Sequence, residues 1–260
     1  MSSFDQLKKE YDDQANAYED YLAKIPLGIL ETQLFKSALG TCTGATILDL
    51  GGGTGIRARQ AIEAGAVAVD VVDISPQMLQ VGRDVEASLR REDVIHWYLG
   101  DVSKPLDGVP LRETAYDIVM ANWVLDHAAT AAVLKGMWRN IAGYLKLGGR
   151  FLGMRSGDPR APAMTDGRAR YGMSYKDHKD VPDGVHFRYV VHLDPPIEFE
   201  ASSMRTSYSG STEMHEKFGL RDVEVEPYEN TEVFRQDPEF WKVFLDNPSM
   251  VVVKARKNVS

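Results

Sequence analysis

One stretch near the start of the chain, ILDLGGGTG at residues 47–55, constrains the fold more than any other. It has the pattern of a short apolar strand that carries an acid, Asp49, and runs into a turn with four glycines in five positions. Glycines leave the backbone of such a turn bare, so a ligand can approach it closely. A helix is expected from about Ile56, with its free N–H groups and positive dipole end facing a carboxylate or phosphate. The run therefore predicts a nucleotide-type cofactor site.

The same turn also has a second interpretation. GTGIRA at residues 53–58 fits the G-x-G-x-x-A variant of the dinucleotide fingerprint, and Asp73 follows near the expected spacing of about 20 residues. On this interpretation the chain is an NAD-dependent oxidoreductase. The strands further along the chain help to decide between this interpretation and another nucleotide-type cofactor.

Four more apolar stretches follow in order, at residues 67–72, 94–99, 116–121 and 149–154. The first ends at Asp73, which is placed after a parallel strand to accept hydrogen bonds from ribose hydroxyls. The second ends in Gly-Asp-Val at residues 100–102, which puts a carboxylate and a backbone N–H where an adenine edge would lie. Strands that alternate with helices predict an α/β fold with a doubly wound, mostly parallel sheet. An oxidoreductase offers no reason for the motif at residues 100–102.

This ordered set resembles the class I S-adenosylmethionine-dependent methyltransferases. The motifs are Asp49 with its glycine turn, Asp73, residues 100–102 and the Leu-Gly-Gly turn at residues 147–149. The resemblance covers roughly residues 45–155. It implies a Rossmann-like sheet of seven strands with N-terminal helices and an inserted substrate cap. It also implies S-adenosylmethionine as cofactor and in-line methyl transfer to a small-molecule acceptor.

The distal half is similar to small-molecule methyltransferases of secondary metabolism, of the toxoflavin N-methyltransferase type. This likeness rests on four short motifs, RYG at 170–172, HFRY at 186–189, DPP at 194–196 and PEFW at 238–241.

The strand-end positions and the family resemblance together predict the site residues. The cofactor-binding set is Tyr11, Tyr18, Asp49, Gly51, Gly53, Gly55, Asp73, Ile74, Met78, Asp101, Val102, Asn122 and Trp123. The catalytic candidates are His127 and Tyr171. Each has a structural alternative: Asp73 can cap a helix, Asp101 can serve an ordinary turn, the two N-terminal tyrosines can simply pack, and His127 can bond a backbone carbonyl.

The chain is predicted to form one methyltransferase domain in four parts. These are an N-terminal helical cap (1–40), a cofactor-binding core (45–155), a substrate-cap insertion (156–207) and a closing helix with strands (208–260). Residues 155–207 are expected to be irregular, because Pro, Gly, Asp and His interrupt the strand–helix alternation. Four aromatic residues of this segment are expected to line the acceptor site: Tyr171, Tyr175, Phe187 and Tyr189.

Composition limits the partners. A net charge of −8 and a pI near 5.3 argue against nucleic acid, which is bound by clustered Lys and Arg. Cys42 stands alone and the histidines are scattered, so no metal site is predicted.

No apolar run approaches the roughly 20 residues that span a bilayer, and residues 1–13 lack a signal-peptide core, so the cytoplasm is the expected compartment. A homodimer is compatible with this interpretation. A catalytically inactive methyltransferase fold that serves as a binding or regulatory subunit is a further alternative.

Overall fold

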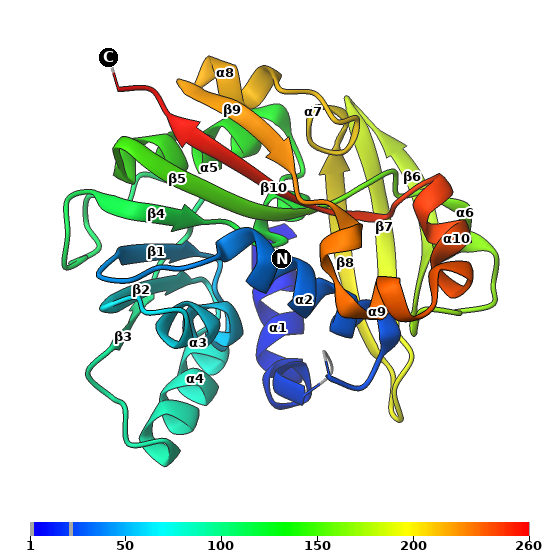
Figure 1. Ribbon diagram of the computed structural model, residues 1–260, viewed down its shortest axis with the longest axis horizontal. Helices are drawn as coiled ribbons and strands as arrows, with labels where there is room; N and C mark the ends of the chain where they lie inside the picture. Colours follow the sequence, from blue (N-terminus) through cyan, green and yellow to red (C-terminus); the bar gives the residue numbers. More distant parts are fainter. Residues whose placement is uncertain (1–2, 21–22, 260) are drawn as a thin grey trace.

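The computed structural model describes residues 3–20 and 23–259, without the side chains of residues 3–5, 7 and 16–20. Within these residues the central sheet has seven strands in the spatial order β3-β2-β1-β4-β5-β10-β9 (Figure 1). The strands are β1 (Thr46–Leu50), β2 (Ala68–Asp73), β3 (Ile95–Leu99), β4 (Tyr116–Met120), β5 (Leu145–Ser156), β9 (Leu220–Val225) and β10 (Met250–Lys257). Strands β1 to β5 run parallel, whereas β10 is antiparallel to both β5 and β9. The predicted doubly wound, mostly parallel sheet of seven strands is confirmed.

The strand order reverses at β1, whose neighbours are β2 on one side and β4 on the other. In open α/β sheets ligands bind at such a switch point, beyond the carboxyl ends of the strands. The glycine turn after β1 lies at this edge. The fold therefore brings the ends of β1, β2, β3 and β4 to one place.

Helices flank the sheet. They are α1 (Ser3–Asp20), α2 (Pro26–Leu39), α3 (Ile56–Glu63), α4 (Pro76–Ser88), α5 (Ala131–Tyr144), α6 (Pro162–Thr165), α7 (Arg205–Tyr208), α8 (Glu213–Lys217), α9 (Glu232–Gln236), α10 (Pro238–Asp246) and the 3-10 turns η2 (Val124–His127) and η3 (Tyr228–Asn230). At α4, the Ser75 hydroxyl accepts a hydrogen bond of 3.0 Å from the Met78 N–H, and Pro76 occupies the first helical position.

The segment that the sequence predicts as irregular is instead a second sheet. Strands β6 (Met173–Val181), β7 (Gly184–Val191) and β8 (Ile197–Met204) form an antiparallel sheet in that order. The expectation of an irregular segment is wrong because residues 185–189 and 197–201 alternate between apolar and polar side chains, a pattern that predicts strands. Turn residues separate the strands, so each alternating run is only about five residues long.

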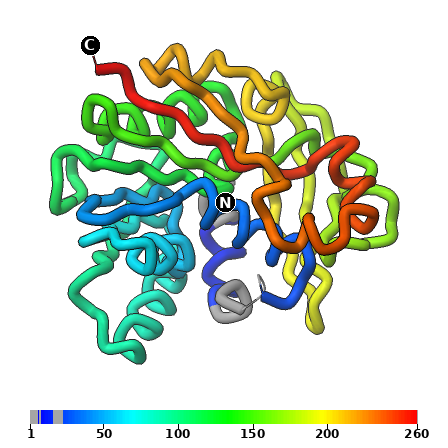
Figure 2. The backbone as a smooth tube through the Cα atoms, viewed as in Figure 1, coloured from blue at the N-terminus to red at the C-terminus, as the bar shows by residue number. Residues whose placement is uncertain are grey.

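Helix α1 joins the two sheets, and Figure 2 shows its blue tube between them. Asp12 accepts a hydrogen bond of 2.5 Å from Ser75 at the start of α4. On the other side, the Gln14 amide donates to the Glu198 carbonyl at 2.8 Å and accepts from the Glu198 N–H at 3.2 Å. The helix thus covers an edge of β8 and the carboxyl ends of the central strands together.

One apolar cluster runs from the central sheet into the second sheet. It contains Ile47 and Val69 of the central sheet together with Phe187 and Phe199 of the inserted one. None of the helices in the described part of the chain is long and apolar enough to cross a membrane.

Candidate active site

Strand β1 carries Asp49 to the base of the glycine turn. Its side chain is fully buried, and neither carboxylate oxygen has a hydrogen-bond partner among the described residues. The side-chain amide of Asn122, just after β4, makes no close hydrogen bond in that part of the chain, although it lies near enough to Asp49 to lower the pKa of that carboxyl. Burial raises the pKa of Asp49 to about 7, although the Arg57 guanidinium acts in the opposite direction. Buried polar groups without partners cost folding free energy. The pair therefore suits a ligand that donates hydrogen bonds, such as an ammonium group.

Asp73 ends β2 and holds the glycine turn in place. One carboxylate oxygen accepts from the Gly53 N–H and the other from the Ser75 N–H, both at 2.9 Å. Burial raises the pKa of Asp73, and these backbone hydrogen bonds oppose the rise. Each carboxylate oxygen has a second lone pair, so Asp73 can orient the turn and still accept from a ligand.

The glycines of the turn have different surroundings. A Cβ added at Gly53, which has φ +55°, would meet nothing within 4 Å. A Cβ at Gly51 would lie 2.5 Å from a Val124 methyl, and one at Gly55 would lie 2.4 Å from the Trp97 ring. Gly53 alone of these three therefore presents bare backbone to open space. Gly55 does not line the cavity described below, so its predicted contact with the cofactor is replaced by a role in packing and in starting α3.

Asp101 lies beyond β3 and is held by its own turn. One oxygen accepts from the Ser103 N–H at 3.0 Å and from the Ser103 hydroxyl at 2.6 Å, and Lys104 pairs with the other at 3.0 Å. Burial alone would raise the pKa of Asp101, but these partners hold it below its usual value. The turn fixes the neighbouring Val102 at the wall of the cavity.

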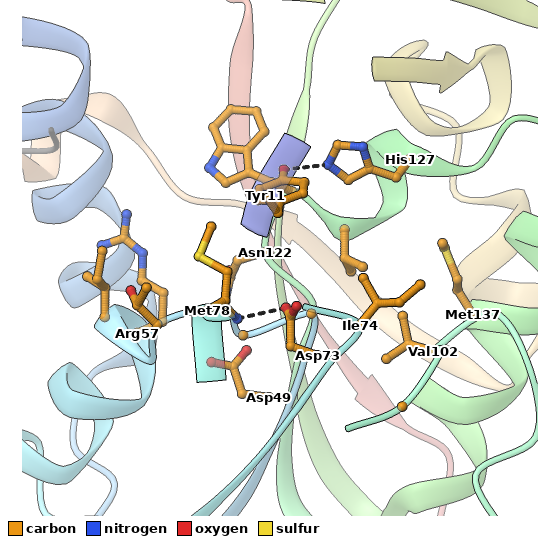
Figure 3. Close-up of a pocket in the computed structure, with 18 of the residues that line it drawn as sticks. Tyr11, Asp49, Arg57, Asp73, Ile74, Met78, Val102, Asn122, His127 and Met137 are labelled. Carbon is orange, nitrogen blue, oxygen red and sulfur yellow. Dashed lines mark hydrogen bonds between the residues drawn. The ribbon is translucent and has the colours of Figure 1, made fainter. Parts of the chain in front are cut away.

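Tyr11 reaches the site from α1 and contacts His127 of η2. Its hydroxyl lies 2.9 Å from the His127 Nε2 atom (Figure 3). It also lies 3.4 Å from the Tyr189 hydroxyl. Its ring stacks on Phe199 at 4.6 Å between centroids. The surrounding protein lowers the pKa of His127 to about 4, against a hydrogen bond with the Glu200 backbone. The imidazole is therefore neutral at pH 7 and able to accept a proton.

These elements enclose a cavity of about 910 Å³ at the carboxyl ends of the strands (Figure 3). The predicted residues that line it are Tyr11, Asp49, Gly51, Gly53, Asp73, Ile74, Met78, Asp101, Val102, Asn122, Trp123 and His127. The side chain of Tyr18 lies outside the described residues, although its backbone belongs to α1. The structure thus brings nearly all of the predicted cofactor residues to one place.

Two lining residues that the sequence analysis missed form a buried ion pair. Glu31 of α2 pairs with Arg57 of α3, and the Trp123 indole N–H donates to Glu31 at 3.0 Å. Both charged side chains are almost fully buried. Arg57 could have been suspected from its place just after the glycine turn. Glu31 lies on an apolar helix far away in the sequence, where no local motif marks it.

A second cavity of about 400 Å³ adjoins the first and shares Trp123 and His127 with it. The other lining residues are Asp126, Ser156, Met173, Tyr175, Phe187, Tyr189 and Ala201. The three aromatic residues among them come from β6 and β7 of the inserted sheet. Tyr175, Phe187 and Tyr189 were expected to line an acceptor site, and here they lie together beside the larger cavity.

Tyr171 does not join them, and its predicted catalytic role does not fit its position. It is fully buried and lines neither of the two cavities. Its hydroxyl donates to the Phe240 carbonyl at 3.0 Å and accepts from the Phe244 N–H at 3.2 Å, while its ring stacks on Trp241. Tyr171 therefore anchors α10 to the inserted segment.

The residues present can hold a zwitterionic nucleoside ligand. Unpartnered Asp49 and Asn122 offer an acceptor and an amide at one end of the larger cavity, and Gly53 offers open backbone. Asp73 and Val102 lie farther along the same wall. Within the described residues, no group of three or more His, Cys, Asp or Glu side chains could hold a metal ion.

The fold and the site together define an α/β protein that binds a nucleoside-type cofactor at a strand-order switch point. Residues 47–149 match the family model described as a methyltransferase domain. This match covers the strands and turns that build the larger cavity.

Three comparisons with individual proteins agree with this match. The chain is 29% identical over 161 residues to the demethylmenaquinone methyltransferase of Tropheryma whipplei (strain Twist), which covers 60% of this chain and 61% of that protein. It is 37% identical over 108 residues to the ribosomal protein L11 methyltransferase of Vibrio cholerae, which covers 42% of this chain and 32% of that protein. The CcbJ methyltransferase from Streptomyces caelestis has the same fold, with a TM-score of 0.63 at 20% identity over 96% of this chain and 98% of that one.

These findings show a methyltransferase domain at residues 47–149 on a methyltransferase fold, and they agree with the predicted resemblance to the class I S-adenosylmethionine-dependent methyltransferases and with S-adenosylmethionine as cofactor. The chain matches less than two thirds of the length of its curated relatives, 61% and 32%, so its own reaction is argued below from its cavities.

Proposed function

We propose that this chain transfers a methyl group from S-adenosylmethionine to a small-molecule acceptor. The observation that carries this proposal is the pair of adjoining cavities with a common wall of Trp123 and His127. A transferase of this kind needs one compartment for the donor, one for the acceptor and a boundary where the two meet.

The larger cavity suits the donor. Asp49 and Asn122 would hold the ammonium group of its methionine part, and Gly53 would allow the close approach of that part to the backbone. Asp73 would accept from the ribose hydroxyls. Four further lining residues, Ile74, Met78, Asp101 and Val102, would enclose the adenine. These roles follow the positions of the residues along the wall.

When bound, the cofactor supplies a methyl group already activated on a sulfonium, so transfer breaks a carbon–sulfur bond, forms a bond to the acceptor atom and leaves a neutral thioether and a proton. The protein's task is to align the two molecules and to exclude water. Orientation of this kind lowers a barrier by roughly 7–11 kcal/mol in favourable cases. The Trp123 and His127 wall and the covering helix α1 would supply it.

His127 is suited to receive the proton that the acceptor releases. The imidazole is neutral because its pKa is lowered to about 4, and it borders both cavities. The Tyr11 hydroxyl lies 2.9 Å from Nε2 and the Glu200 backbone also bonds the imidazole, so the proton would reach the ring by way of the Tyr11 hydroxyl, which would pass on its own proton as it gains the acceptor's. An acceptor that becomes positively charged as it gains the methyl group is a strong acid, so a weak base suffices.

The size of the second cavity supports a small acceptor over a macromolecule. At about 400 Å³, open solvent included, it is less than half the size of the cavity assigned to the cofactor. The net charge of −8 disfavours RNA or DNA. Of the relatives, one is named for demethylmenaquinone and another for a ribosomal protein, so family membership alone leaves the acceptor open. The likeness of the distal half to methyltransferases of secondary metabolism favours a secondary metabolite.

The test is transfer of isotope-labelled methyl from S-adenosylmethionine to a metabolite extract, followed by separation of small molecules from macromolecules. We expect label in a small-molecule product, made by the wild type and strongly reduced with Asp73→Asn. Loss of one charge-assisted ribose hydrogen bond should weaken cofactor binding by about 1.5–3 kcal/mol. Label found only in protein or nucleic acid would overturn the proposed acceptor class. Cofactor binding without any transfer would favour the inactive, regulatory alternative.

A further inference from the structure

The inner face of the inserted sheet forms one wall of the second cavity. Tyr175 of β6 lies directly opposite Tyr189 of β7, and Phe187 lies opposite Ala201 of β8. Residues two apart on a strand point to the same face, so these four side chains form a continuous surface. The small side chain of Ala201 leaves room beside the rings.

Another part of the lining comes from the turn after β4 and holds Trp123. Its backbone has φ +64°, in the left-handed region that is uncommon for a residue other than glycine. The conformation is fixed by the Trp123 N–H, which donates to the Met154 carbonyl at 2.8 Å, and by the indole N–H, which donates to Glu31 at 3.0 Å. The cavity is therefore lined by aromatic side chains from two separate elements, the inserted sheet and the turn after β4.

Among the described residues that line the second cavity, few polar side chains carry a charge that a ligand could pair with. Asp126 is its one acidic side chain: it is buried, its oxygens accept from the Ser156 N–H and the Ser203 hydroxyl at 2.8 Å each, and burial raises its pKa, which favours the uncharged acid. His127 is neutral at pH 7, and no Lys or Arg lies in this lining. A charged molecule would lose its hydration here without gaining an ion pair.

From these two observations we infer that the second cavity binds a compact, flat, uncharged acceptor with a conjugated ring system, placed between Trp123 and the aromatic face of Phe187 and Tyr189. This inference rests on the proposed function. Ring systems stack favourably on aromatic side chains. The donor's sulfonium next door repels a cation, and a protonated amine has no lone pair with which to accept a methyl group.

Four ligands of similar size test the inference by calorimetry in the presence of saturating S-adenosylhomocysteine. They are 2-naphthol (flat and neutral), naphthalene-2-carboxylate (flat and anionic), 2-(aminomethyl)naphthalene as its cation, and decahydro-2-naphthol (neutral but saturated). We expect 2-naphthol to bind at least about tenfold more tightly than each of the others. The cation is the sharpest control, because aromatic walls also attract cations. Equal or tighter binding of a charged or saturated probe, or no binding of 2-naphthol, would overturn the inference.

Variants locate the binding. Ala201→Leu should fill the cavity and weaken 2-naphthol binding at least about tenfold, with the affinity for S-adenosylhomocysteine unchanged. Lys176→Leu adds the same side chain to the exposed face of the same sheet and serves as the matched control. Phe187→Leu keeps an apolar side chain but removes a ring, so it should weaken 2-naphthol roughly two- to tenfold and leave decahydro-2-naphthol unaffected. Unchanged 2-naphthol affinity in both cavity variants would contradict the assigned location.

The two proposals fail separately. Binding of S-adenosylhomocysteine without discrimination among the probes removes the inference about the acceptor and leaves the proposed function standing. Absence of S-adenosylhomocysteine binding removes the proposed function and this inference with it.

Discussion

The Trp123 indole donates a hydrogen bond of 3.0 Å to the Glu31 carboxylate, which is at the same time the partner of the Arg57 guanidinium. Three elements that are distant in the sequence, α2, α3 and the turn after β4, meet at this carboxylate. Because Trp123 borders both cavities, Glu31 connects the wall of the cofactor site to the wall of the proposed acceptor site.

A double-mutant cycle should detect this connection. Trp123→Phe removes one hydrogen bond to a charged group, worth about 1.5–3 kcal/mol, and Glu31→Gln leaves the buried Arg57 without its counter-ion, at about 3–5 kcal/mol. The double variant should lose less free energy of unfolding than the sum, by at least about 0.5 kcal/mol in denaturant titrations. Trp138→Phe is the matched control, because the buried Trp138 indole N–H has no partner among the described residues. We expect additive losses of unfolding free energy when Trp138→Phe is combined with Glu31→Gln. Equally additive losses for Trp123→Phe combined with Glu31→Gln would show that the hydrogen bond contributes nothing.

Cofactor affinity should depend on the protonation of Asp49. Its pKa in the free protein is raised to about 7, and a bound ammonium group would favour the carboxylate and lower that pKa. Affinity for S-adenosylhomocysteine should therefore be full above pH 7 and fall as the pH drops through 7, by up to about tenfold per pH unit. Calorimetry across this range, in buffers of different ionisation enthalpy, should also show proton release on binding.

Asp49→Asn is the control for this pH dependence. The variant should bind more weakly at pH 8 but lose most of the dependence near pH 7, leaving any contribution of Asp73, whose pKa burial also raises. As the pH rises from about 3.8, the pKa of Asp49 in the unfolded chain, to about 7, its pKa in the folded protein, the free energy of unfolding of the ligand-free wild type should decrease. In this range Asp49 ionises in the unfolded chain but stays protonated in the folded protein. A pH dependence identical in wild type and variant would assign it to another group.

Two glycines of the same turn should separate binding from stability. Both have positive φ, so each change to Ala costs roughly 1 kcal/mol of strain. Gly53→Ala places its Cβ in open space at the cavity wall and should mainly weaken S-adenosylhomocysteine binding. Gly55→Ala drives its Cβ against the Trp97 ring. It should lower the free energy of unfolding by about a further 1–3 kcal/mol and therefore also lower the thermal midpoint. The reverse ranking in a thermal-shift and calorimetry comparison would contradict these positions.

Tyr171→Phe should affect stability rather than cofactor binding or transfer. The change leaves the Phe244 N–H and the Phe240 carbonyl without their buried partner, a loss of about 1–3 kcal/mol in the free energy of unfolding. Affinity for S-adenosylhomocysteine should stay within error. A variant that keeps wild-type stability but loses transfer activity would restore Tyr171 as a catalytic candidate.

The central sheet and most of the cofactor wall could be predicted because their signals are local. Each parallel strand is a short apolar run, and its functional residue stands at or just past its end, as Asp73 ends β2 and Asn122 comes two residues after the end of β4. The strand pairing then collects these residues at one edge without any further information from the sequence.

The second sheet and the Glu31 ion pair could not be predicted in this way. Alternation of period two is present in β7 and β8, but each alternating run is short and the two are separated by turn residues that include Pro195 and Pro196. Glu31 reaches its partner Arg57 only when α2 packs beside α3. Tyr171 was predicted to be catalytic because a buried tyrosine and a catalytic one cannot be told apart in sequence. Tertiary packing decides these cases.

Calorimetry with S-adenosylhomocysteine and NAD tests the central claim most directly, because the glycine turn alone is compatible with both cofactors. We predict binding of S-adenosylhomocysteine with a dissociation constant on the order of 1–10 µM and no NAD binding up to about 1 mM. Binding of NAD with no response to S-adenosylhomocysteine or S-adenosylmethionine would contradict the account.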